Sequence, residues 1–432
     1  MTRNLLVVGI DGGTWTILRP AIEQGYMPFV KDIVNRGASG ILRSTIPAIT
    51  PVAWSSFQTG RNPGNLGIAN WQIWDREAKE SRFINARTLG STLWEQVSEQ
   101  GLRVATINVP VTYPPQSING SVVTGLLTPS VDTNFTHPPE FRDELLRAVP
   151  DYQTPAMSGW GRFASDCDYS QFLKTMARAT AMRLTATELL IKKEAWNLLM
   201  VHFHAHDVVE HRMWHHLDQS HKLHDEKIRH DLFENFYRPL DDAINQIYQK
   251  FQDRSANECG LLLISDHGMQ ANNRIFNLSD WLMDHDLLSL DEQIVRRHRW
   301  GKRLRSLDFL KLRKLVSREY RRNMANALDP AFEDKTNLID WENTQAFALS
   351  GSAEIGIYVV ATEDTPQYSD IVSRVSNEFR ELVDPQTGES VIDRVRHKSQ
   401  VWKGEKMHLM PDVVAEMRAG YSYGFNLSSD AE

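Results

Sequence analysis

The sequence predicts an α/β protein with a mostly parallel central sheet. Residues 4–10 (NLLVVGI) form a continuous apolar run rather than an alternating one, which is typical of a strand buried on both faces in a parallel sheet. Further strand candidates are residues 104–109 (VATINV), 197–203 (NLLMVHF) and 260–264 (GLLLI), and the last two are also candidates for burial. Helical segments around residues 20–37, 90–101 and 169–196 separate them. This alternation of strand and helix predicts a sheet covered by helices on both faces.

The 432 residues are too many for one small core, so we expect either one large α/β domain with an insertion or two intimate domains. We assign residues 1–290 to the α/β core. Residues 291–340 are expected to form a basic helical insertion or cap, because Lys and Arg greatly outnumber acids between residues 296 and 322. A solvated helical lid and a cationic cap that attracts an anionic substrate both fit this segment. Residues 341–432 return to α/β patterning and are expected to be the C-terminal part of the core, whereas residues 110–165 are expected to form long loops.

Composition argues against several classes of protein. The net charge of −7 gives no sign that a nucleic-acid polymer is the partner. The 2 cysteines, Cys167 and Cys259, lie far apart, which argues against a disulfide framework and indicates a reducing compartment. The N-terminal apolar run is too short for a secretion signal, and no stretch is long and apolar enough to cross a bilayer. We therefore expect a cytoplasmic protein without a membrane segment.

One stretch combines acidic and imidazole side chains at helical spacing. In HAHDVVEHRMWHH, residues 204–216, Asp207 and His211 are four residues apart, so on a helix both side chains lie on one face. One carboxylate and one imidazole are two of the three protein ligands of a typical catalytic zinc site. The pair directly follows a predicted strand, and ligands of open α/β sheets bind at the carboxyl ends of strands. A solvent-facing polar helix with ordinary histidines is the alternative interpretation.

Further polar positions suit the same chemistry. Asp266 and His267 follow the predicted strand at 260–264, Asp11 ends the first strand, and Thr50 precedes a glycine-punctuated loop. With the pair described above, these residues are a coherent set for a two-metal phosphoryl-transfer site. Two cations can hold the attacking and leaving oxygens, and metal coordination can activate a threonine hydroxyl. Mixed Asp and His ligands favour zinc, with manganese as the alternative.

Four motifs, taken together, resemble a known family. They are VVGIDGG, TPVAWSSFQTGRNPGNLGI, DVVEHRMWHH and SDHGM, and a weaker tail motif reads DPQTGESVI…VWKGEKMHLMPDVV. The sequence resembles the alkaline phosphatase superfamily, in particular the type I phosphodiesterase/nucleotide pyrophosphatase group. The motifs occur in the family's order and span nearly the whole chain, so as a set they are highly specific.

The resemblance implies a fold and a site. The expected fold is an alkaline-phosphatase-like three-layer α/β/α sandwich with a helical insertion, in which residues 1–290 are the metal-binding catalytic core. Thr50 matches the nucleophile, which is also a ligand of the second metal, and would sit near a helix N-terminus that favours phosphate. Asp11 matches an aspartate of the first metal, Asp207 and His211 resemble its further ligands, and Asp266 and His267 resemble those of the second metal. Asn70 matches a phosphate-binding asparagine only loosely, because the spacing differs by one residue.

One departure concerns the histidine that completes the first metal site in the family. No histidine follows His408, which we expect to lie at the surface. We expect a chain cut before its last ligand, with another histidine, such as His206 or His215, as the alternative. His202, His204 and His206 alternate along a predicted strand end, and we interpret them as supporting residues, although this pattern can also bind metal.

These expectations describe a metal-dependent hydrolase of phosphate esters that holds two divalent metal ions. The favoured reaction is that of a phosphodiesterase or nucleotide pyrophosphatase acting on a small phosphate ester or a nucleotide, with Thr50 attacking phosphorus. A phosphomonoesterase or phosphotransferase on the same scaffold is an alternative, because the metal core does not select the ester. A non-catalytic anion-binding relative is a further alternative, supported by the missing histidine.

Overall fold

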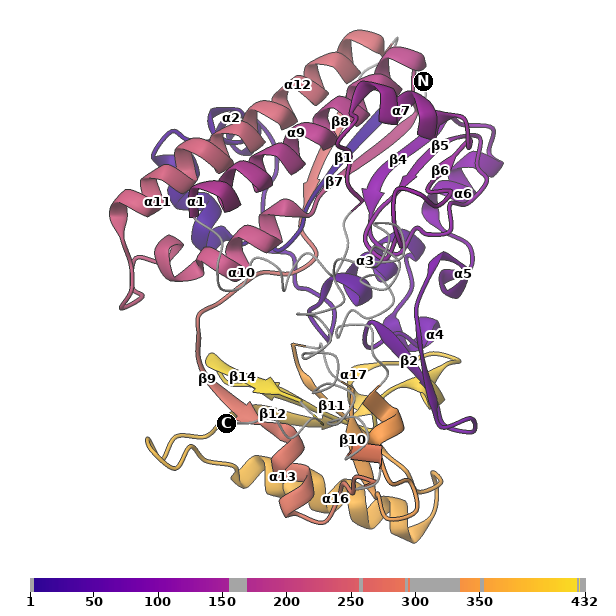
Figure 1. The fold of residues 1–432 in the computed structure, drawn as a ribbon, viewed down its shortest axis with the longest axis vertical. Helices are drawn as coiled ribbons and strands as arrows, with labels where there is room; N and C mark the ends of the chain where they lie inside the picture. The colour runs from indigo at the N-terminus through magenta and orange to yellow at the C-terminus, as the bar shows by residue number, and fades with distance from the viewer. Residues whose placement is uncertain are drawn as a thin grey trace, which may run out of the picture. The chain divides into compact units, whose positions relative to one another are not determined.

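The computed structural model describes residues 4–154, 169–255, 259–291, 294–295, 335–349, 353–425 and 427. The chain divides into two compact units, and Figure 1 labels their helices and strands. The first unit comprises Met1–Asn62 and Ile84–Ala271, and the second comprises Pro63–Phe83 and Asn272–Glu432. Within the described ranges, no helix has both the length and the apolar character needed to span a membrane.

The first unit is built on a six-stranded sheet with the order β6-β5-β4-β7-β1-β8. Its strands are β1 (Asn4–Ile10), β4 (Val104–Val109), β5 (Gly120–Thr124), β6 (Thr136–His137), β7 (Leu198–Phe203) and β8 (Cys259–Ile264). Neighbouring strands pair in parallel, except that β6 is antiparallel to β5. The predicted α/β protein with a mostly parallel central sheet is therefore confirmed.

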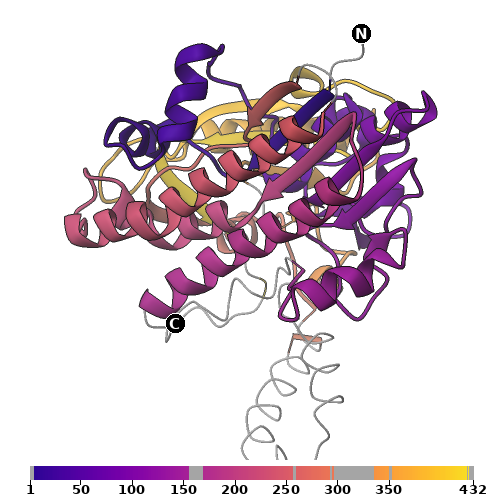
Figure 2. The ribbon, with the colours of Figure 1, turned by 90° about the horizontal axis from the view of Figure 1, so that it is seen from above.

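Helices cover both faces of this sheet. They are α1 (Trp15–Glu23), α2 (Pro28–Arg36), α3 (Thr50–Thr59), α5 (Ala86–Leu89), α6 (Leu93–Glu99), α7 (Phe141–Ala148), α9 (Tyr169–Lys193), α10 (Ala205–Leu217), α11 (Glu226–Leu232), the π-helix η1 (Phe233–Tyr237) and α12 (Arg238–Arg254). On one face α9 and α12 lie side by side (Figure 2) and bury Leu6 and Val8 of β1. On the other face α3 and α6 pack Trp54 and Trp94 against Val7. The alternation along β1 explains why its apolar run is continuous.

Two local predictions for the first unit were wrong. The single helix expected around residues 20–37 is two helices, because Gly25 adopts a left-handed φ of 84° between them. Residues 110–165, expected to form loops, contribute β5 and α7 to the core, where Val123 and Phe141 are 0% exposed. The apolar run of β5 is too short to stand out from its glycine-, serine- and proline-rich surroundings.

The second unit has a four-stranded antiparallel sheet with the order β10-β11-β13-β12. Its elements are α4 (Pro63–Leu66), β2 (Gln72–Asp75), β3 (Glu80–Phe83), β9 (Asn272–Asn277), α13 (Leu278–Asp284), the 3₁₀ helix η3 (Lys335–Leu338), β10 (Ala346–Ala348), β11 (Ile355–Val359), α16 (Pro366–Glu381), β12 (Ile392–His397), α17 (Lys398–Val401), the 3₁₀ helix η4 (Met407–Leu409), β13 (Val413–Met417) and β14 (Gly420–Gly424). Helix α16 packs on this sheet, and β14 pairs in parallel with β9. Trp281, Phe347 and Phe379 are buried in a core of its own.

The division differs from the expected one. We expected residues 341–432 to complete the core formed by residues 1–290, whereas from Asn272 onward the chain belongs to the second unit, together with Pro63–Phe83. The strand candidates on either side of this boundary look alike in sequence, because a buried run does not state which sheet buries it. Most of the expected basic insertion at 291–340 lies outside the described residues, so the helical cap stays a prediction.

Candidate metal centre and active site

Polar side chains of the first unit gather where three adjacent strands end. Asp11 follows β1, Asp207 lies in the first turn of α10 directly after β7, and Asp266 and His267 follow β8. Because β7, β1 and β8 are neighbours and parallel, their carboxyl ends meet at one edge of the sheet. Each of these residues therefore lies where the sequence predicts a site.

Thr50 reaches this group from α3, which packs on the face of the sheet opposite to α9 and α12. It is the first residue of α3 and is only 5% exposed. Its Oγ lies 3.3 Å from Oδ1 of Asp11 and 3.2 Å from Nε2 of His267. Pro51 follows it in the first turn, where the missing N–H of proline costs nothing. The positive end of the helix dipole therefore lies beside the hydroxyl, which favours a bound anion.

The acids form two clusters that share Asp11. Potential ligand atoms of Asp11, Asp266 and His267 all lie within 4.8 Å of one another, and so do those of Asp11, His204 and Asp207. Asp11, Asp207 and Asp266 are 0%, 1% and 7% exposed. Three buried carboxylates in contact are unfavourable without a compensating positive charge.

Several of these oxygens have no hydrogen-bond donor among the described residues. Oδ1 of Asp266 accepts a bond of 3.1 Å from the backbone N–H of Gly12, but Oδ2 accepts none. Neither oxygen of Asp207 accepts a hydrogen bond in the described part of the chain. Buried polar atoms are rarely left in this state in proteins. Oxygen and imidazole groups with spare lone pairs fit divalent cations, so the residues present suit a metal centre.

The electrostatics of the cluster agree with this interpretation. Burial opposes ionisation of Asp11, but contacts with His202 and His204 hold its pKa well below the usual range. Burial, reinforced by the charge of Asp11, raises the pKa of Asp266 well above its ordinary value. For His267 burial lowers the pKa, but the surrounding carboxylates outweigh burial and raise it to about 9. Without metal, groups at the positions that cations would occupy are therefore protonated more readily than usual.

The histidines expected near this site differ in whether they contact the candidate metal ligands. Nε2 of His211 lies 3.5 Å from Oδ1 of Asp207, so the pair shares one helix face as the spacing predicts. Among the described residues, His204 joins a cluster of potential metal ligands, whereas His206 and His215, the expected substitutes, do not. The only signal for His204 in the sequence is the alternation of histidines at the strand end. His408 is exposed, as expected.

Asn70 belongs to the second unit. Its side chain is 4% exposed, and its Oδ1 accepts a hydrogen bond of 2.6 Å from the backbone N–H of Trp71. That bond orients the amide locally. The expected role of Asn70 in binding a phosphate oxygen stays a prediction.

A mostly parallel α/β sheet thus carries acids, imidazoles and a hydroxyl at its carboxyl edge, an arrangement that suits the hydrolysis of phosphate esters. The family comparison agrees with that chemistry. Residues 5–431 match the family model "Type I phosphodiesterase / nucleotide pyrophosphatase", and the chain belongs to this family.

Two solved structures, both of one phosphonoacetate hydrolase, support the fold. A phosphonoacetate hydrolase from Sinorhizobium meliloti 1021, in complex with phosphonoformate, is 14% identical, with a TM-score of 0.55, over 99% of this chain and 83% of that one. Its complex with phosphonoacetate is 13% identical, with a TM-score of 0.55 and the same coverage. Human ectonucleotide pyrophosphatase/phosphodiesterase 5 is 13% identical, with a TM-score of 0.48, over 99% and 82% of the two chains. No curated protein sequence matches the chain.

Proposed function

We propose that this protein is a metal-dependent phosphodiesterase or nucleotide pyrophosphatase that uses Thr50 as its nucleophile and holds two divalent cations. One observation carries the proposal. The hydroxyl of Thr50 lies at a helix N-terminus, beside Oδ1 of Asp11 and Nε2 of His267. A nucleophile, a set of metal ligands and an anion-binding helix end therefore coincide.

The two clusters and the family resemblance together suggest the residues that would hold the cations. Asp11, Asp266 and His267 form one cluster, with Thr50 beside it, and Asp11, His204 and Asp207 form the other. The resemblance makes His211 a further candidate ligand in the cluster of Asp207, and its Nε2 lies 3.5 Å from Oδ1 of Asp207. The mixture of carboxylate and imidazole groups favours zinc, with manganese as the alternative. Bound cations supply a lowered pKa to a coordinated hydroxyl or water and offset the charge of the phosphate.

The chain's own groups set the geometry of the reaction. Oγ of Thr50 forms a bond to phosphorus, the alcohol or phosphate leaving group departs, and water then hydrolyses the phosphothreonine ester. Asp11 orients the hydroxyl through its Oδ1, 3.3 Å away. The N-terminal end of α3 favours the negative phosphoryl group throughout. The substrate class is a small phosphate ester or nucleotide.

The decisive variant is Thr50→Ala. We expect turnover of a chromogenic phosphodiester to fall by about a thousandfold or more, because the covalent step is lost. Metal content, measured by mass spectrometry of the purified chain, should stay close to that of the wild type, because the carboxylates and imidazoles remain. Thr59→Ala is the matched control, since it changes the same residue type at the other end of α3. Unchanged turnover in Thr50→Ala would refute the assignment of Thr50 as the nucleophile.

Assays with different substrates distinguish the proposed function from its alternatives. The wild type is assayed with a diester, the matching monoester and phosphonoacetate, with zinc or manganese and with a chelator control. Diester turnover that the chelator abolishes supports the proposal, and turnover of the monoester alone indicates a phosphomonoesterase. Phosphonoacetate is included because a structure of similar fold is a phosphonoacetate hydrolase. A folded, metal-loaded chain that turns over none of them is an anion-binding relative.

A further inference from the structure

The alternating histidines of VHFHAH, residues 201–206, all contact one residue. Nε2 of His202 lies 2.9 Å from Oδ2 of Asp11, and Nδ1 of His204 lies 3.1 Å from the same oxygen. Nδ1 of His206 lies 2.9 Å from the backbone carbonyl oxygen of Asp11. Two histidines therefore hold the carboxylate of Asp11, and the third holds its main chain.

Strand pairing explains this convergence. β7 and β1 are parallel neighbours in which Gly9 pairs with His202 and Ile10 with Phe203. The backbone N–H of Asp11 donates to the carbonyl oxygen of Phe203 at 3.3 Å, which continues the ladder past the end of β1. His202 is the only one of the three histidines on β7; His204 is the N-cap of α10 with helical φ and ψ, and His206 lies in the first turn of α10. The turn from β7 into α10 therefore brings the three side chains to the residue that follows β1.

The two carboxylate oxygens of Asp11 have different surroundings. Oδ2 is occupied by His202 and His204. Oδ1 lies 3.3 Å from Oγ of Thr50 and 3.5 Å from Nε2 of His267. Contacts on Oδ2 fix the rotation of the carboxylate, so that Oδ1 is presented to the nucleophile and to the neighbouring ligands. All three histidines are buried, with exposures of 0%, 8% and 0%.

We propose that His202, His204 and His206 are positioning residues that fix Asp11 for metal binding, and we name them the Asp11 clamp. The inference rests on the proposed function, because it takes Asp11 to be a metal ligand. A carboxylate or carbonyl oxygen only accepts hydrogen bonds, so the facing ring nitrogen carries the proton. That nitrogen is Nδ1 in His204 and His206. Nε2 of His202 lies 2.9 Å from Oδ2 of Asp11 without the alignment of a hydrogen bond, and the proton is assigned to it because of this proximity. Partners that orient metal ligands in this way typically contribute about 10- to 100-fold in metal affinity.

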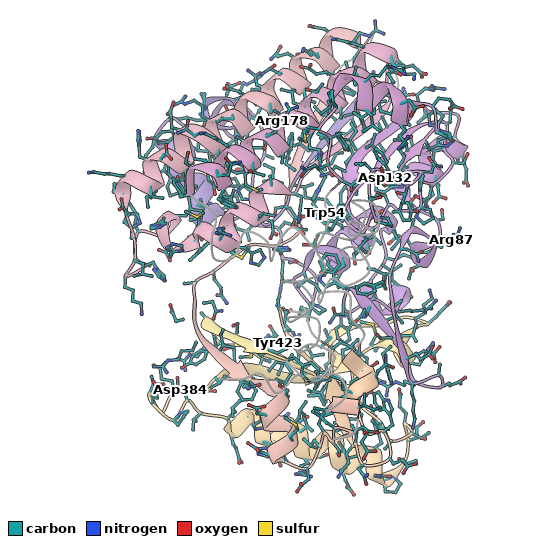
Figure 3. All side chains as sticks on the ribbon, in the orientation of Figure 1. Trp54, Arg87, Asp132, Arg178, Asp384 and Tyr423 are labelled. Atoms are coloured by element: carbon teal, nitrogen blue, oxygen red, sulfur yellow. The ribbon has the colours of Figure 1, made fainter. Side chains whose placement is uncertain are left out.

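His202 also connects the clamp to the helix of the nucleophile. Its ring meets the ring of Trp54 edge-on, with centroids 4.9 Å apart and an angle of 85° between planes. Trp54, labelled in Figure 3, lies one turn after Thr50 on α3. A Cβ on Gly9 would come within 2.7 Å of Cη2 of Trp54 and 3.1 Å of Cδ2 of His202. Glycine at this position thus allows α3 and the clamp to pack together.

Replacing each histidine of the clamp by Gln or Asn tests the proposal, because the side-chain amide nitrogen of each substitute takes the place of one ring nitrogen. The amide nitrogen of Gln occupies roughly the place of Nε2, and that of Asn the place of Nδ1. We expect His202→Gln to keep metal affinity within about threefold and His202→Asn to weaken it about 10- to 100-fold. His204 and His206 should show the opposite order, with Asn tolerated and Gln damaging. Competition with a metal-binding dye measures zinc affinity without relying on turnover.

The matched controls are His408→Gln and His408→Asn, since His408 is exposed in the second unit. Both should leave zinc affinity unchanged. Equal losses for Gln and Asn at each clamp position would overturn the proposal, because only the loss of a specifically placed donor produces the reversed orders. Thermal unfolding of each variant without metal separates lost affinity from lost folding.

A second measurement needs no variant and no activity. Long-range proton–nitrogen NMR of the histidine rings in the metal-free wild type reads which nitrogen is protonated. The clamp requires protons on Nε2 of His202 and on Nδ1 of His204 and His206, and any other pattern overturns it. Loss of the Nδ1 proton of His204 on zinc addition would make His204 a direct ligand instead. A chain that binds zinc but hydrolyses no ester refutes the proposed function, and the affinity orders still decide the clamp.

Discussion

The two units of the molecule bury aspartates in opposite ways. In the second unit, Asp412 is 0% exposed and accepts hydrogen bonds of 2.8 Å from Nη2 of Arg76, 2.9 Å from Nζ of Lys398 and 2.9 Å from the hydroxyl of Tyr368. Burial opposes its ionisation, but the two cations outweigh burial and hold the pKa of Asp412 below the usual range. The chain itself thus supplies the countercharge for this carboxylate.

In the first unit, Asp207 and Asp266 are buried without an Arg or Lys partner among the described residues, and the cation beside Asp266 is the imidazolium of His267, 3.3 Å away. Burial raises the pKa of both, and the charge of Asp11 raises it further. Within the described residues, the groups facing them are other carboxylates and the imidazoles of the cluster rather than Arg or Lys. A buried acid whose countercharge comes from Arg and Lys of the chain is part of the scaffold, whereas a group of buried acids without such partners is suited to a cation from solution.

The largest effect on stability is expected for Asp412→Ala, which removes the buried acid whose countercharge the chain itself supplies. Removing this carboxylate leaves Arg76 and Lys398 without their buried partner, and such losses cost about 3–5 kcal/mol of stability. Zinc affinity should not change, because Asp412 belongs to the other unit. Chemical denaturation and dye competition measure the two quantities.

Asp393→Ala is the control for this prediction, because Asp393 is an exposed aspartate on β12. Its free energy of unfolding should match that of the wild type. A fall in stability of less than about 1 kcal/mol in Asp412→Ala would show that the buried cluster contributes no more than a surface ion pair.

A smaller effect of opposite sign is expected for Asp207→Asn in the metal-free protein. The change removes a buried charge that faces other carboxylates, so stability at neutral pH should rise by about 1 kcal/mol, the low end of the gain from removing poorly compensated buried charges. Zinc affinity should fall in the same variant, because a ligand is lost. Unfolding with and without zinc measures both effects.

Asp242→Asn is the matched control, since Asp242 is exposed on α12 of the same unit. A metal-free Asp207→Asn protein that is less stable than the wild type would contradict the comparison. It would mean that the carboxylate of Asp207 has a structural partner in the fold without metal.

The smallest effect is a proton release on metal binding. The pKa of His267 is raised to about 9 in the metal-free protein, so its imidazole is protonated at pH 7 and must lose that proton to bind a cation. Zinc affinity should therefore rise with pH up to about 9, by at most about tenfold per unit from this group, and level off above it. Calorimetry in two buffers with different ionisation enthalpies counts the protons released.

His267→Asn provides the reference for that count. It should release about one proton fewer per metal bound at pH 7 and should bind zinc more weakly. Equal proton release by the wild type and this variant would show that His267 is already neutral or is not a ligand.

Much of the candidate site was predictable from local sequence. The runs that become β1 and β8 are followed closely by Asp11 and Asp266, and an apolar strand that gives way to polar residues is a local pattern. β1 is largely buried as expected, whereas β8 is the edge strand of the sheet and is only partly buried, with Leu262 40% exposed. The spacing of Asp207 and His211 places both on one face of α10 without knowledge of the fold. The role of each residue came from the resemblance to the family rather than from spacing.

Other features depend on contacts that sequence spacing does not contain. The alternation of His202, His204 and His206 was visible, but not that all three contact Asp11. That convergence requires β7 to be the parallel neighbour of β1, although about 190 residues separate them. The boundary of the second unit at Asn272 is likewise a matter of which sheet buries which strand.

Where the strands end and which acids and imidazoles follow them could be predicted without the fold, because both depend on neighbours within a few residues. The position of Thr50 near a helix N-terminus came from the resemblance to the family. Strand order, the sharing of Asp11 between two clusters and the contrast between Asp412 and Asp207 became visible only in the folded chain. Side-chain periodicity is a local property, whereas the charge that surrounds a buried carboxylate is set by segments distant in the chain.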